Sequence, residues 1–70
     1  MDNKKCFNII KGDINLIEQG TKAIKKILSK DHKSKEDIHK LEYILDYLNI
    51  YLNEATKQMK KIKKDNEQKC

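Results

Sequence analysis

Proline, arginine and tryptophan are absent from this chain, and glycine occurs only as Gly12 and Gly20. An all-β fold needs many turns, and turns depend on proline and glycine, so the composition favours helix. No segment approaches the roughly 20 apolar residues that span a bilayer. The start, which reads MDNKKCFNIIKGD, lacks the apolar run of a signal peptide. We therefore expect a cytoplasmic protein with reduced thiols.

The missing arginine limits what the net charge of +5 says about partners. All sixteen basic residues are lysines, whereas arginine is the side chain suited to bidentate contacts with guanine edges and phosphates. An AT-rich coding sequence explains such a composition without any nucleic-acid partner. The lysine content is therefore weak evidence for nucleic-acid binding.

Apolar side chains recur at alternating steps of three and four in two segments, which is the pattern of one apolar face on an α-helix. The first face consists of Phe7, Ile10, Ile14, Ile17, Thr21, Ile24 and Leu28. The second consists of Ile38, Leu41, Leu45, Leu48, Leu52, Ala55, Met59 and Ile62. The unbroken alternation predicts close packing of one helix on another.

A short polar stretch separates the two segments. Within it, Ser34 and Asp37 fit a capping box, in which the hydroxyl accepts a first-turn N–H and the acid faces the positive end of the helix. We expect one domain with a first helix at about 4–30, a connection at 31–34, a second helix at about 35–64 and a frayed basic tail at 65–70. The short connection predicts an all-α, antiparallel two-helix hairpin, and two hairpins would dimerise into a four-helix bundle.

The chain carries more apolar surface than two helices can bury against each other. A second row on the first helix, containing Ile9, Leu16, Gly20, Ala23 and Ile27, lies about 100° round from the main face. The window 43–52 on the second helix has only two polar residues, and a helix apolar nearly all round is normally buried. The candidate partner-binding residues are Tyr43, Tyr47, Ile50, Tyr51, Ile9, Leu16 and Ile27. Half-exposed tyrosines with solvated hydroxyls are the alternative reading of this surface.

These features predict a small, non-catalytic protein-protein interaction module, such as a regulator, inhibitor or adaptor, that binds a helical partner or a second copy. Phosphate-cradling glycine loops, nucleophile elbows and zinc motifs are absent from the sequence. His32 and His39 alone form no regular metal frame. We therefore expect no enzyme activity, cofactor or metal. Gly20 either permits a close helix approach or is simply tolerated at a cost of about 1 kcal/mol.

Nucleic-acid binding is the alternative function. Four lysines share one side of the second helix and would neutralise phosphates: Lys57, Lys60, Lys61 and Lys64. The stretch from Gln19-Gly20 through Lys35-Glu36-Asp37-Ile38 to Glu54 and Gln58 also resembles the tRNA-associated WHEP hairpin. That resemblance implies binding of RNA or of an aminoacyl-tRNA synthetase complex through lysines of the first helix and the connection. The chain departs from the WHEP pattern in needing an insertion before Lys35 and in lacking the arginine after the glycine.

Cys6 and Cys70 lie near opposite ends of the chain. An antiparallel hairpin brings both ends to one pole, so an intramolecular disulfide and an intermolecular one both remain open. In a reducing cell we expect two free thiols.

Overall fold

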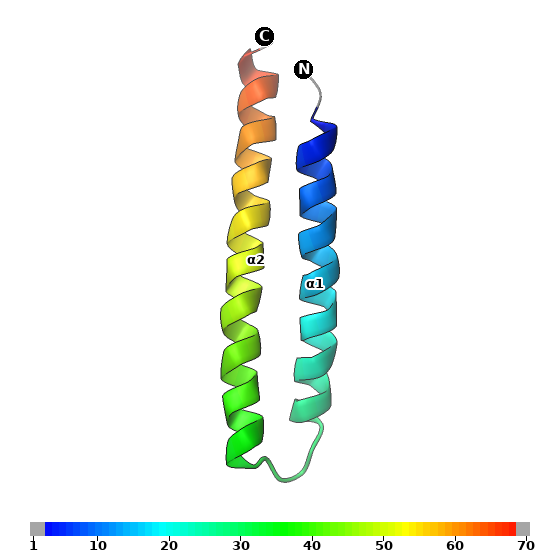
Figure 1. Cartoon of the computed structure of the whole chain (residues 1–70), viewed down its shortest axis with the longest axis vertical. Coiled ribbons are helices and arrows are strands. Elements are labelled where there is room, and N and C mark those ends of the chain that lie inside the picture. The colour runs from blue at the N-terminus through cyan, green and yellow to red at the C-terminus, as the bar shows by residue number, and fades with distance from the viewer. Residues whose placement is uncertain (1–2, 69–70) are drawn as a thin grey trace.

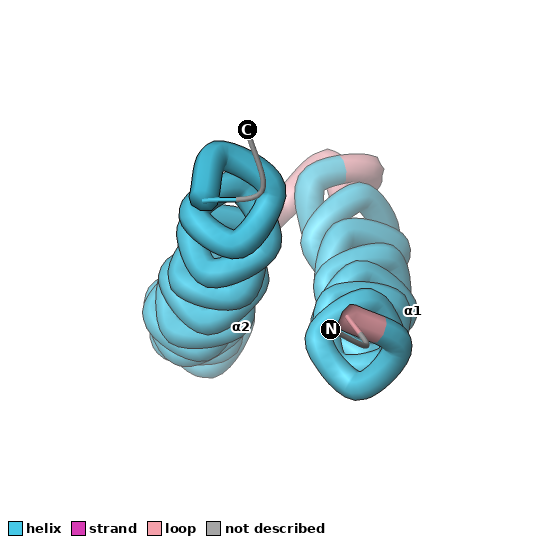
Figure 2. Tube along the Cα trace, turned by 90° about the horizontal axis from the view of Figure 1, so that it is seen from above, coloured by secondary structure: helices cyan, strands magenta, loops and turns pink. Residues whose placement is uncertain are grey.

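The computed structural model describes residues 3–68 and contains two α-helices, α1 (Lys4–Leu28) and α2 (Lys35–Gln68) (Figure 1). The helices run antiparallel and stay side by side along their length, as the view down the long axis also shows (Figure 2). The hairpin is 55 Å long and 14 Å across in both other directions. The described residues include no strand. The predicted all-α helical hairpin is therefore confirmed.

α1 ends at Leu28, two residues before its expected end at residue 30, so the connection begins at Ser29. The Lys30 backbone N–H donates to the Ile27 carbonyl at 3.1 Å. The two residues are three positions apart, so this bond closes a 3₁₀ turn, which is narrower than an α-helical turn. The Ser29 hydroxyl donates back to the Lys26 carbonyl at 2.7 Å. The last carbonyls of a helix have no donor within the helix, and these two bonds satisfy those of Lys26 and Ile27. The helix therefore ends here without the glycine that often ends a helix.

The predicted capping box at the start of α2 is confirmed. The Asp37 backbone N–H donates to the Ser34 hydroxyl at 3.1 Å, and the Ser34 N–H donates to Asp37 Oδ2 at 3.0 Å. Lys30 Nζ donates to Asp37 Oδ1 at 2.9 Å. The hydrogen bond from Lys30, with those from Ser34, lowers the pKa of Asp37 from 3.8 to about 2. Asp37 therefore caps α2 and also joins it to the connection.

The far end of α2 extends past the expected boundary at residue 64, as far as Gln68. No glycine or proline follows Gly20, and lysine, glutamate and glutamine have good helix propensity. Residues 65–68 are therefore helical. Residues 69 and 70, including Cys70, lie outside the described part of the chain.

The two helices meet along a narrow line that we call the interhelical seam. Its buried residues are Asp13, Gly20 and Ile27 on α1, and Asp37, Ile44, Ala55, Gln58 and Ile62 on α2. Cys6 and Tyr51 continue the same rows and are half-buried. Only four of the buried residues are hydrophobic, namely Ile27, Ile44, Ala55 and Ile62. The seam is thus a thin core with polar residues within it.

The prediction that the two main apolar faces pack on each other is wrong in detail. Four residues on each face are exposed, including Phe7, Leu28 and Leu45. On α1 the seam instead follows a row that contains Gly20 and Ile27, two residues of the predicted second row. A Cβ built on Gly20 would lie 2.6 Å from Leu48 Cδ2. The glycine thus permits a close approach that a larger residue would block, so the helices turn this row toward each other.

Candidate protein-binding surfaces

One side of the hairpin carries a row of exposed apolar residues from each helix. Each of these residues directly follows a residue of the seam, so its side chain points about 100° away from the seam. The two seams face each other and the helices are antiparallel. A step of 100° about each helix axis, counted from its seam, therefore leads to the same side of the hairpin on both helices. Together the rows form what we call the wide apolar face, which consists of Phe7, Ile14, Leu28, Ile38, Leu45, Leu52 and Met59, each between 41% and 55% exposed.

The floor of the wide apolar face is also apolar. Between the two exposed rows lie the half-buried Ile10, Ile17, Ile24, Leu41 and Leu48 and the buried Ala55 and Ile62. Thr21 is the polar interruption in the α1 row. Its hydroxyl donates to the Ile17 carbonyl at 2.8 Å, so it is satisfied within the helix. A partner that covers this face therefore leaves no side-chain hydrogen-bonding group without a bond at this position.

The two exposed rows lie level with each other. Gly20 is opposite Leu48, and antiparallel helices advance by equal steps in opposite directions. Counted from this contact, each pair of row residues is level to within about two residues, or about 3 Å. The pairs are Phe7 with Met59, Ile14 with Leu52, Thr21 with Leu45, and Leu28 with Ile38. The 21 residues from Ile38 to Met59 rise by about 31 Å. The wide apolar face therefore extends along most of the hairpin.

The opposite side carries a smaller apolar surface, the tyrosine face, which consists of Tyr43, Tyr47 and Ile50 of α2 with Ile9 and Leu16 of α1. Tyr47 is half-buried and contacts Tyr43 edge to face, with ring centroids 5.5 Å apart. On its other side it meets Tyr51 in the same way at 5.7 Å. Tyr43 and Ile50 are the most open, at 70% and 65% exposure. The tyrosine face thus has three exposed members, Leu16, Tyr43 and Ile50.

The structure divides the residues predicted to bind a partner. Ile27 is 8% exposed within the seam, so its expected place on a free surface is wrong. The reason is that the Gly20 row, to which Ile27 belongs, faces α2. Ile9, Tyr47 and Tyr51 are half-buried, whereas Leu16, Tyr43 and Ile50 are exposed. A role for these residues in binding stays a prediction.

The sequence pattern did not identify the wide apolar face as a surface, because its residues were assigned to the core of the hairpin itself. A signal was present in the row Cys6, Asp13, Gly20 and Ile27. Three of these four residues are small or polar, so the row looked unsuited to a core. A small residue in a helix contact nevertheless lets the backbones approach, and the bulkier rows are then turned outward.

The carboxyl groups of Asp13 on α1 and Glu54 on α2 form an interacting pair across the two helices. Asp13 is 4% exposed, and its Oδ2 has no hydrogen-bond partner among the described residues. The hydrogen bond with Asp13, followed by its negative charge and by burial, raises the pKa of Glu54, while Lys57 opposes the shift. Like charges so close disfavour full ionisation. The pair therefore weakens the seam when both groups are charged.

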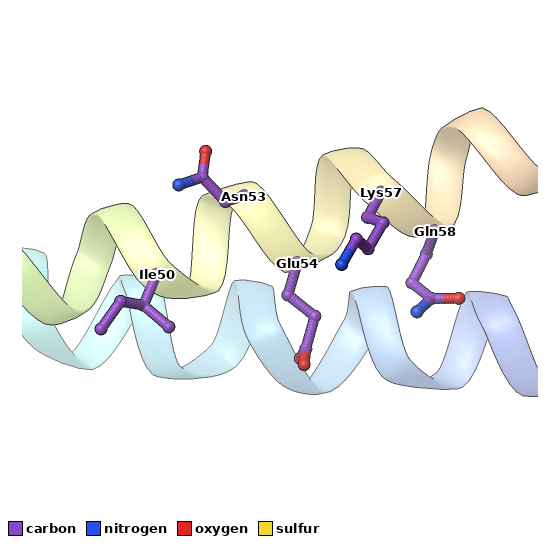
Figure 3. Close-up of a pocket in the computed structure, with 5 residues that line it drawn as sticks. All are labelled: Ile50, Asn53, Glu54, Lys57 and Gln58. Carbon is purple, nitrogen blue, oxygen red and sulfur yellow. The ribbon is translucent and has the colours of Figure 1, made fainter.

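The hollow beside this pair has a volume of about 420 Å³ and is lined by Ile50, Asn53, Glu54, Lys57 and Gln58. Glu54 is directed toward α1, whereas Asn53 points away from it (Figure 3). A second hollow of about 320 Å³ lies near the connection and has Lys26, Lys30 and Lys40 in its wall. No cluster of three or more metal-ligating side chains occurs among the described residues. Both hollows lie on the side of the tyrosine face.

The four lysines of the predicted anion site are all exposed. Lys57 and Lys64 follow Ile50 at steps of seven, so they extend a row of the tyrosine face toward the end of α2. They lie away from the wide apolar face. Binding of phosphates by these lysines stays a prediction.

Comparisons with known proteins add no function. No family model, curated protein or solved structure matches this chain. The WHEP resemblance therefore gains no support from them. No helix in the described residues is long and apolar enough to cross a membrane.

Proposed function

We propose that this protein is a non-catalytic interaction module that binds helical protein segments along its wide apolar face. The observation that carries the proposal is the pairing of two level, exposed apolar rows over an apolar floor. A large exposed apolar face with polar surroundings marks interaction sites in soluble proteins. An amphipathic helix has the complementary shape, since its apolar stripe fits between two parallel rows.

The size of the face sets the strength of such a complex. Full burial of a large apolar side chain stabilises by about 1.5–3 kcal/mol. The seven residues are about half exposed, so covering all of them would contribute roughly 7 kcal/mol. Association costs at least about 4 kcal/mol in lost freedom. One bound helix therefore gives a weak complex, and a partner that covers the whole face gives a stronger one.

A direct test uses a synthetic helix as the probe. The probe is an amphipathic peptide with leucine at alternating steps of three and four, and with glutamate and lysine elsewhere. It is largely unfolded alone, because short isolated helices are marginal in water. We expect it to gain helicity on mixing with the protein, as measured by circular dichroism of the mixture against the sum of its parts.

Two double variants on α2 provide a matched comparison. Leu45→Asp with Leu52→Asp charges the wide apolar face, and Tyr43→Asp with Ile50→Asp charges the tyrosine face at the same spacing. All four positions are at least half exposed, so both variants retain the seam. We expect the first to abolish the gain in helicity and the second to retain it. No gain with the unmodified protein, or equal loss in both variants, would contradict the proposal.

A further inference from the structure

We infer that the partner of the wide apolar face is a second copy of this chain, in a four-helix bundle whose two connections lie at opposite ends. This inference rests on the proposed function, because it uses the same face. It adds the identity of the partner and its orientation. Two features carry it: the area of the face and the charges along its edges.

The area fits a two-helix partner. The face is about 31 Å long and two helices wide, and packed helices lie about 10 Å apart. It therefore presents on the order of 600 Å², and two such faces together bury on the order of 1,200 Å². Stable interfaces begin at about that size, and a single helix would cover only part of it. A second copy provides two helices at the matching spacing.

Charged residues border the face along the outer edge of each helix, about 40° further round than the exposed row. On α1 this edge carries Lys4, Lys11, Glu18 and Lys25, and on α2 it carries Glu42 and Lys63 with the neutral Asn49 and Thr56 between them. When the connections lie at opposite ends, α1 packs beside α1 of the second copy. A two-fold axis midway between Lys11 and Glu18 then sets each Lys11 against Glu18 of the other copy.

The same axis also matches the charges on α2. The midpoint between Glu42 and Lys63 lies at residues 52 and 53, and the midpoint on α1 lies at residues 14 and 15. Because Gly20 lies against Leu48 and antiparallel helices advance by equal steps in opposite directions, these two levels lie within about one residue of each other in the hairpin. One axis therefore sets Glu42 against Lys63 of the other copy as well. The single two-fold axis thus gives four ion pairs, against two like-charge pairs between Lys4 of one copy and Lys25 of the other.

The arrangement with both connections at the same end fits less well. There α1 packs beside α2 of the second copy, level with it. Lys25 then faces Glu42, but Lys4 faces Lys63, while Lys11 and Glu18 face the neutral Thr56 and Asn49. This arrangement gives two ion pairs and two like-charge pairs. Charge complementarity therefore favours connections at opposite ends.

The test measures mass and then exchanges charges. A single chain has a mass of 8.3 kDa, and sedimentation equilibrium should show twice that mass as concentration rises. Lys11→Glu alone sets glutamate against Glu18, and Glu18→Lys alone sets lysine against Lys11. Each should weaken the dimer about tenfold, since exposed pairs contribute up to about 1 kcal/mol each and two are reversed. The combined swap Lys11→Glu with Glu18→Lys should restore it.

The swapped sites lie seven residues apart on an exposed edge, so the hairpin itself is unaffected, and unchanged helicity checks this. A dimer that ignores both single changes contradicts the opposite-end arrangement. A mass of 8.3 kDa at every concentration, with the probe peptide still bound, contradicts the second copy but leaves the proposed function. Loss of both self-association and peptide binding rejects both. A dimer retained by Leu45→Asp with Leu52→Asp would show that it forms through another surface, contradicting the inference.

Discussion

Replacement of Gly20 by alanine tests whether the helices touch where the structure brings them closest. In a helix interior, alanine is more favourable than glycine by about 1 kcal/mol. A Cβ on Gly20 would lie 2.6 Å from Leu48 Cδ2 and 3.2 Å from the Tyr47 hydroxyl. Overpacking of this kind costs typically about 1–3 kcal/mol. We therefore expect Gly20→Ala to lower the free energy of unfolding by about 1 kcal/mol, despite the better helix propensity.

Gly12 provides the matched control within the same helix. A Cβ built on Gly12 meets nothing within 4 Å. Gly12→Ala should therefore raise the free energy of unfolding by about 1 kcal/mol. The two variants should then differ by roughly 2 kcal/mol, which is well within reach of urea denaturation followed by circular dichroism. The measurements are made at one protein concentration, because association would add its own stability.

A second background identifies the atom responsible. In a Leu48→Ala chain the closest obstruction to a Cβ at position 20 is removed and only the Tyr47 hydroxyl, at the end of a flexible side chain, stays near it, so Gly20→Ala should become stabilising there. This change of sign is a coupling between the two positions that a double-mutant cycle measures. Equal gains from Gly12→Ala and Gly20→Ala in the unmodified background would refute the close approach. So would a Gly20→Ala effect that Leu48→Ala leaves unchanged.

Three further predictions concern the polar groups of the hairpin. The pKa of Glu54 is raised above 4.5 in the folded state. Ionisation of Glu54 therefore lowers the free energy of unfolding of the protein as the pH rises above 4.5. Glu54→Gln should therefore be more stable than the unmodified protein at neutral pH and equal to it in acid, as urea denaturation at the two pH values would show; a constant difference would refute the role of Asp13. The pKa of Asp37 is lowered to about 2, so its contribution is full above 3.8 and is lost as pH falls toward 2. Asp37→Asn should remove that acid-side loss from a pH titration of thermal stability, and an unchanged titration would show that the charge of Asp37 does not stabilise the hairpin. Ser34→Ala removes the cap and should cost about 1 kcal/mol in urea denaturation, whereas a neutral result would show that the cap contributes nothing.

The helices and the hairpin were predictable because their signals are local. The 3–4 apolar spacing identified both helices, and the Ser34–Asp37 capping box marked the start of α2 to the residue. The rotation of each helix about its own axis was not predictable in the same way. A turn of about 60° changes no local propensity, and α1 carries three adjacent rows that each offer partial burial. The contact between Gly20 and Leu48 decides among them, and it depends on both helices at once.

That rotation also explains the outcome for the candidate sites. Leu45 and Leu52 were assigned to the core of the hairpin, yet the rotation exposes them on the wide apolar face. Ile27 was assigned to a free surface, yet the same rotation buries it. Tyr43 and Ile50 were correctly expected to be outside the seam, because they lie on the far side of α2 in either rotation.

The sparse, polar seam has a consequence for how the chain finds its alignment. A seam that repeats every seven residues invites sliding of one helix by a whole repeat, about 10 Å. Such a slip would move Asp13 from Glu54 to Tyr47 or Lys61, and Gly20 from Leu48 to Leu41 or Ala55. Neither position of the seam therefore excludes a slipped alignment by itself. The register is held instead at the connection, where Lys30 Nζ bonds Asp37 Oδ1 and a slide of about 10 Å would break that bond.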